Sequence, residues 1–138
     1  MIALLLATSL TNPVISIGVQ AINEISVQTM ASSITIPLFP DSVSAQSAYS
    51  ITTNGDYLKI IGSLDLTLPS NLQISATLQA PPGAQSLGQV NLSAQSATLV
   101  SGISRVVASN LAITYTFSSK APVPAGNYSQ IIRLTLTN

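Results

Sequence analysis

The last twelve residues, NYSQIIRLTLTN (127–138), constrain the fold of this chain more than any other stretch. One face of the segment carries Tyr128, Ile132, Leu134 and Leu136, and the other face is mostly polar, with Gln130 and Ile131 breaking the alternation. A period of two predicts a β-strand with one buried face. No further strand follows in the sequence, and a long apolar edge strand promotes aggregation. We therefore expect this strand to need a partner from elsewhere.

The composition favours a protein that packs against other copies of itself. The chain has 138 residues, enough for one domain with a core, but only 6% of them are charged. Four acidic and four basic residues give no net charge, so nothing favours binding to nucleic acid or to an anionic membrane. A neutral surface of Ser, Thr, Asn and Gln resists self-association poorly.

The side chains that carry most enzyme chemistry are missing. The sequence contains no Cys and no His, which excludes Cys–His dyads, Ser-His-Asp triads and the common zinc sites. The side-chain carboxylates are scattered, and no pair has a spacing typical of acid–base catalysis. We expect no enzymatic activity, no cofactor, no metal and no small-molecule substrate. The side-chain carboxylates are those of Glu24, Asp41, Asp56 and Asp65.

Residues 1–21 have the pattern of a secretory signal peptide. Ile2 to Leu10 form an apolar stretch too short to span a bilayer. Val19 and Ala21 are small residues at the positions expected before a cleavage site. We expect secretion with a cut after Ala21. No Lys or Arg precedes the apolar stretch, so a retained extended arm is the alternative.

Residues 22–33 (INEISVQTMASS) form a second alternating segment. Ile25, Val27, Thr29 and Ala31 lie on one face of an extended chain. The segment 34–39 follows almost at once, and Pro37 confines it to an edge or a bulge. Two strands without a tight turn between them leave residues 22–33 able to pair elsewhere.

The middle of the chain reads as short strands separated by turn signals. Asn54-Gly55-Asp56 predicts a hairpin between residues 48–53 and 57–61, and Gly62 is expected to end the second strand. No window shows helical periodicity, so one all-β domain of the sandwich type is predicted. The predicted strands are 48–53, 57–61, 64–68, 72–78 and 110–118, with weaker candidates at 89–92, 97–100 and 103–107.

Both ends of the chain resemble a known family. Ala125-Gly126-Asn127-Tyr128-Ser129 before the last strand is similar to the C-terminal motif of chaperone–usher major pilins of the colonisation-factor (class 5, alpha-fimbrial) group. The alternation of residues 23–31 followed by a proline-containing strand resembles their N-terminus, and Thr52-Thr53-Asn54 before Lys59 resembles their middle hairpin. Spore-coat-U-like secreted pilins share the terminal motif, so it fixes a superfamily and not a branch.

The resemblance implies an immunoglobulin-like β-sandwich that lacks its last strand and is completed by donor-strand exchange. It divides the chain into a signal peptide (1–21), a donor-strand extension (22–33) and a pilin domain (34–138). The donor face would be Ile25, Val27, Thr29 and Ala31, and the acceptor strand Tyr128, Ile132, Leu134 and Leu136. A periplasmic chaperone and an outer-membrane usher would be partners, and the product would be a cell-surface filament for adhesion or biofilm formation.

Other functions fit the same pattern. The N-terminal strand could fold back into its own domain, because alternation is identical in both cases. The protein would then be a self-contained secreted module that binds carbohydrate or a cell-surface partner. A viral or envelope coat protein is a third alternative.

Overall fold

The computed structural model describes residues 16–28, 41–65, 71–122 and 130–138. No helix in these ranges is long and apolar enough to cross a membrane. The strands are β1 (Asn23–Val27), β2 (Asp41–Thr53), β3 (Leu58–Leu64), β4 (Leu72–Leu78), β5 (Gln85–Ser86), β6 (Val90–Asn91), β7 (Ala97–Ile103), β8 (Val106–Ser119) and β9 (Ile132–Thr137).

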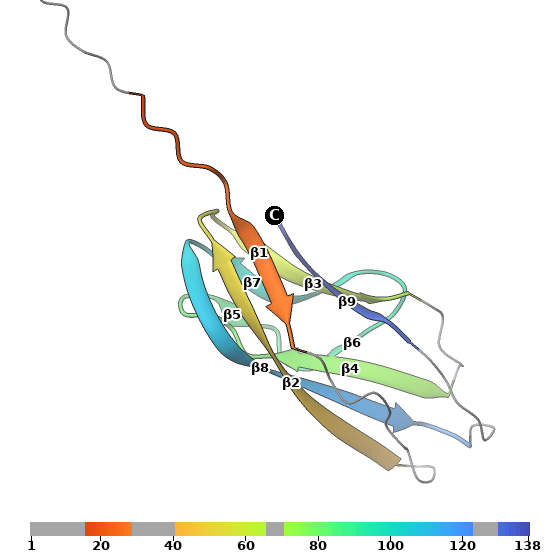
Figure 1. Cartoon of the computed structure of the whole chain (residues 1–138). Helices are drawn as coiled ribbons and strands as arrows, with labels where there is room; N and C mark the ends of the chain where they lie inside the picture. The colour runs from red at the N-terminus through yellow and green to blue at the C-terminus, as the bar shows by residue number, and fades with distance from the viewer. Residues whose placement is uncertain (1–15, 29–40, 66–70, 123–129) are drawn as a thin grey trace, which may run out of the picture.

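The strands form two antiparallel sheets (Figure 1). One sheet has the order β1-β2-β8-β4-β6, and the other has the order β5-β7-β3-β9. β2 and β8 are long and pair along most of their length, which makes them the centre of the larger sheet. The prediction of an all-β chain is confirmed, and the two sheets are compatible with a β-sandwich.

The described residues form one apolar core, to which both sheets contribute. It arises from alternation, because successive side chains of a strand point to opposite faces. In β3, Leu58, Ile60, Gly62 and Leu64 are buried, and the residues that alternate with them are half-buried. The residues of this core are each 6% exposed or less: Tyr49, Ile51, Leu58, Ile60, Leu64, Ile74, Ala76, Leu78, Leu92, Leu99, Val100, Ile103, Leu111, Ile113 and Tyr115.

Several strand predictions are confirmed, but some boundaries differ. The strand predicted at 48–53 is the end of β2, which begins at Asp41. The segment 72–78 is β4, and the segment 110–118 lies within β8. β8 begins earlier because it continues through a bulge beside Asn110, which has a φ of 55°. Gly62 does not end a strand but lies inside β3. A Cβ there would be 2.8 Å from the Leu99 Cδ1 atom, so glycine allows the close approach of Leu99.

The predicted hairpin across Asn54-Gly55-Asp56 is wrong. β2 pairs with β1 and β8, whereas β3 pairs with β7 and β9, so this turn carries the chain from one sheet to the other. Tyr57 follows the turn with a φ of 58°, which redirects the backbone into the second sheet. The turn was correctly indicated by local residues, but the strands that pair on either side of it are determined by distant parts of the chain.

Some predictions fall outside the described residues. These are most of the signal peptide (1–15), the strand 34–39, most of the strand 64–68, and the positions of Thr29, Ala31 and Tyr128. Residues 16–21 of the predicted signal peptide are described, and they form an exposed extended segment leading into β1 (Figure 1).

Candidate functional site

The edge formed by β1 and β9 is the main candidate site. Each of these strands is the last of its sheet, and the two strands contact each other (Figure 1). Within the described residues, β1 hydrogen-bonds only to β2 and β9 only to β3. Each therefore presents one row of backbone N–H and C=O groups that no described strand pairs, and such rows accept an added strand.

The apolar face of β9 is incompletely covered at this edge. Ile132, Leu134 and Leu136 lie opposite Leu64, Gly62 and Ile60 of β3, which places them on the core side. All three are half-buried, whereas the β3 residues they oppose are buried. The prediction that these side chains share the inner face of the last strand is confirmed.

The structure brings part of the predicted donor segment to the same edge. Ile25 lies opposite Ile51 of β2, is half-buried and packs against the core. Val27 lies opposite Tyr49 and is 42% exposed. The strand Asn23–Val27 of the predicted donor segment therefore pairs with β2 of its own chain, and it is the outermost strand of that sheet.

Backbone and side-chain hydrogen bonds hold both ends of β1. At the far end, the Gln28 backbone amide donates to Ala48 O (2.9 Å) and the Ser47 hydroxyl donates to Gln28 O (2.8 Å). At the near end, the Thr53 hydroxyl donates to Asn23 Oδ1 at 2.6 Å. β1 buries one partly covered apolar side chain, Ile25, so these polar contacts carry much of its attachment.

The segment before β1 is held by Asn54. The Asn54 Nδ2 group donates to Gln20 O at 2.8 Å, and the Ile22 amide donates to Asn54 Oδ1 at 2.9 Å. The Asn54 backbone amide also donates to Ile22 O at 3.1 Å. The side-chain amide thus acts as an extra peptide group that continues the ladder beyond the end of β2.

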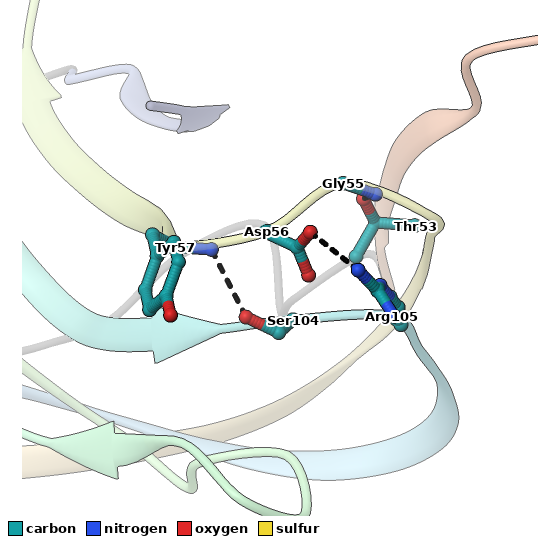
Figure 2. Close-up of polar contacts among 6 residues, drawn as sticks. All are labelled: Thr53, Gly55, Asp56, Tyr57, Ser104 and Arg105. Carbon is teal, nitrogen blue, oxygen red and sulfur yellow. Dashed lines mark hydrogen bonds and ion pairs between the residues drawn. The ribbon is translucent and has the colours of Figure 1, made fainter.

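The turn that contains Asn54 is itself fastened to the β7–β8 turn. Figure 2 shows the Asp56 carboxylate beside the Arg105 guanidinium, 2.8 Å apart, and the Tyr57 amide donating to Ser104 Oγ at 3.0 Å. The Arg105 backbone amide donates to Gly55 O at 2.9 Å. The carboxylate raises the pKa of Arg105 by hydrogen bonding and by charge. Two turns that lie far apart in sequence therefore form one cluster.

Two residues of this turn cluster have strained backbones. Tyr57 has a φ of 58° and Arg105 a φ of 43°, and both are exposed. Left-handed conformations cost a residue with a Cβ roughly 1–2 kcal/mol. Tyr57 is 85% exposed, so little of that cost is recovered by burial of its ring. Strain at an exposed aromatic residue is a reason to consider recognition.

Replacing Tyr57 with glycine should raise the free energy of unfolding by about 0.5–1 kcal/mol. The relief of left-handed strain exceeds the entropy that glycine adds to the unfolded chain. Urea denaturation measures the change. Tyr57→Ala is the matched control, because it removes the ring but keeps the strained Cβ. Equal stability of both variants would contradict strain at this position.

A second ion pair fastens β9 to the end of β3. The Arg133 guanidinium on β9 makes two hydrogen bonds to the Asp65 carboxylate just after β3. The hydrogen bond to Arg133 lowers the pKa of Asp65. This pair fixes the start of β9 in register against β3, on the face away from the core.

The described residues offer little other chemistry. No group of three His, Cys, Asp or Glu side chains among them could hold a metal ion. Comparison with protein-family models, with curated proteins and with solved structures finds no match to this chain. Function therefore has to be inferred from the edge and the turn cluster.

Sequence reasoning missed the contacts of Asn54, Asp56 and Arg105. Asn54 stood out only as a turn residue, although its partner Gln20 is 34 positions away. Asp56 and Arg105 are 49 positions apart. Asp56 belonged to a predicted turn and Arg105 to the weak strand candidate 103–107, so the sequence did not indicate that the two residues meet.

Proposed function

We propose that this protein is a structural subunit of an extracellular filament that assembles by exchange of its N-terminal strand. The observation that carries the proposal is the edge where β1 and β9 meet. There, a short outermost strand lies beside a terminal strand whose inner face is only half-buried. The filament would serve adhesion or biofilm formation.

In this proposal, β1 leaves its place on β2, and residues 22–33 add to β9 of a neighbouring copy. The added strand pairs the exposed backbone row of β9, and each hydrogen bond contributes about 0.5–1.5 kcal/mol. It also covers Ile132, Leu134 and Leu136, and burial stabilises by about 25 cal/mol per Å² of apolar surface. The fold would then be an immunoglobulin-like sandwich completed by its neighbour.

The same edge explains why assembly partners would be needed. A subunit whose N-terminal strand has left exposes the edges of β2 and β9 together, and unpaired edges aggregate. A periplasmic chaperone would cover this edge after secretion, and an outer-membrane usher would pass subunits into the filament. The near-neutral surface suits close packing of identical subunits.

Electron microscopy of the purified full chain tests the proposal, and filaments are expected. Ile25→Asp should abolish them, because it places a charge on the inner face of the exchanged strand. Ser26→Asp is the matched control, since Ser26 is exposed on the same strand and should tolerate the charge. Normal filaments from Ile25→Asp, or from a chain lacking residues 22–33, would overturn the proposal.

A self-contained binding module is the second candidate, and two observations favour it. β1 completes the larger sheet within one chain, and the turn cluster displays Tyr57 beside the Asp56–Arg105 pair. A tyrosine ring can stack on a sugar, and the charged pair can bind hydroxyl groups. This function predicts a stable monomer in gel filtration and no binding of an added peptide of residues 22–33.

A further inference from the structure

Attachment of the segment before β1 depends on one residue, Asn54. Every hydrogen bond that the described residues make to Gln20 and Ile22 comes from Asn54: Nδ2 to Gln20 O, Oδ1 from the Ile22 amide, and the backbone amide to Ile22 O. Apolar contacts contribute little, since Ile17 and Val19 are at least 80% exposed and Ile22 is 43% exposed. The Asn54 amide group is therefore a clamp on this segment.

Asn54 is followed by glycine, and this dipeptide favours deamidation. Asparagine is among the thermolabile residues, and glycine has no side chain to shield its backbone nitrogen. The Gly55 nitrogen attacks Asn54 Cγ and loses its proton, the Cγ–Nδ2 bond breaks, and ammonia leaves with that proton. Water then opens the resulting succinimide to aspartate or isoaspartate. The reaction consumes one water and needs no other reactant.

We propose that Asn54-Gly55 is a modification site whose deamidation releases the N-terminal segment. The product carboxylate cannot donate a hydrogen bond to Gln20 O. It instead directs a negatively charged oxygen at a carbonyl oxygen that now lies 2.8 Å from Nδ2. Isoaspartate also lengthens the backbone of the turn. Either product removes the hydrogen bond from Nδ2 to Gln20 O.

The docked segment protects the site from this reaction. Both polar atoms of the Asn54 side chain are engaged, and the Gly55 amide donates to Thr53 Oγ1 at 3.0 Å. The Thr53 hydroxyl in turn donates to Asn23 at the start of β1. These contacts hold the attacking nitrogen and Cγ in place, so deamidation proceeds when the segment is off. The change is one-way, because Nδ2 is lost as ammonia and the modified residue cannot donate to Gln20 O again.

This inference rests on the proposed function for its purpose, since the segment before β1 leads into the strand offered to a neighbour. Its chemistry is independent of assembly. A deamidated subunit would hold the start of this strand less firmly than a fresh subunit and would exchange it more readily.

Hydrogen exchange with mass spectrometry on the full-length monomer tests the clamp. Wild type, wild type aged until Asn54 is deamidated, and Asn54→Asp are compared. Exchange of residues 20–27 should be about tenfold faster in the last two, as expected for loss of a hydrogen bond and a new repulsion. Protection of β4 and β8 confirms that each protein is folded. Asn91→Asp, the same change at an exposed site on β6, should leave residues 20–27 unchanged.

Unchanged protection of residues 20–27 in folded Asn54→Asp, and in aged wild type, would overturn the clamp. An equal rise in Asn91→Asp would also overturn it, because the effect would then come from charge alone. Filament formation is scored separately by electron microscopy. If the segment is released but no filaments form, the clamp is supported and the proposed function is refuted. If filaments form but residues 20–27 stay fully protected in Asn54→Asp monomers, the proposed function is supported and the clamp is refuted.

Discussion

Replacing Ile60 with alanine should lower the free energy of unfolding by about 3–4 kcal/mol. Ile60 is fully buried in the middle of β3, where it lies opposite Val100 of β7 and Leu136 of β9. Truncation removes three carbon atoms and leaves a cavity that both neighbouring strands line. Because domains are stable by only about 5–15 kcal/mol, the loss is a large part of the total, and urea denaturation followed by circular dichroism will measure it.

Ile61→Ala is the matched control for Ile60→Ala. The neighbouring residue belongs to the same strand and undergoes the same chemical change, but it is half-buried on the opposite face. Its loss should stay below about 1.5 kcal/mol, since the side chain keeps partial access to water and leaves no enclosed cavity. Equal losses for the two variants would contradict the assigned inner face of β3. They would also contradict the inner face of β9, which pairs with β3.

The strands themselves were predictable, because alternation is a local property. In β4, Ile74, Ala76 and Leu78 are buried in agreement with the pattern read from the sequence. In β9, Ile132, Leu134 and Leu136 all face inward as predicted. Alternation with a period of two does not depend on which strand is the partner, so it can be recognised whatever topology the chain adopts.

The pairing of the strands was not predictable, because it depends on distant residues. Asn54-Gly55-Asp56 is a strong hairpin signal, but hydrogen bonds from the β7–β8 turn reach Gly55 and Tyr57 and lead the chain into the other sheet. Gly62 was read as a break, although glycine there makes room for Leu99. In both cases a local rule was overridden by packing between segments about forty or more positions apart in the sequence.

The two strands of the candidate site were predictable from the sequence, but their positions relative to each other were not. The sequence indicated that residues 22–33 and the last strand both need partners. It could not indicate whether the first strand pairs within its own chain, because Ile25 and Val27 alternate identically in either case. Contact between β1 and β9 arises from the order of strands in two different sheets, which no local pattern encodes.

Raising the pH through 10 to 12 should destabilise the protein by about 2–3 kcal/mol through Tyr49 alone. Tyr49 is fully buried and its hydroxyl donates to Gln79 O at 2.5 Å. Burial raises the pKa of this phenol to about 12, whereas in the unfolded chain it is about 10. Below the lower value both states are protonated and stability is unaffected. Between the two values only the unfolded state loses its proton, so stability falls by about 1.4 kcal/mol per pH unit.

The difference between wild type and Tyr49→Phe isolates this effect. Phenylalanine cannot ionise, so the variant should lose stability less steeply above pH 10. Burial also raises the pKa of Tyr115, but that residue contributes equally to both proteins and cancels in the difference. At neutral pH the variant should be less stable by about 1 kcal/mol, since Gln79 O loses its donor. The two stability curves should therefore converge and cross as the pH rises, and parallel curves would show that Tyr49 is accessible to water.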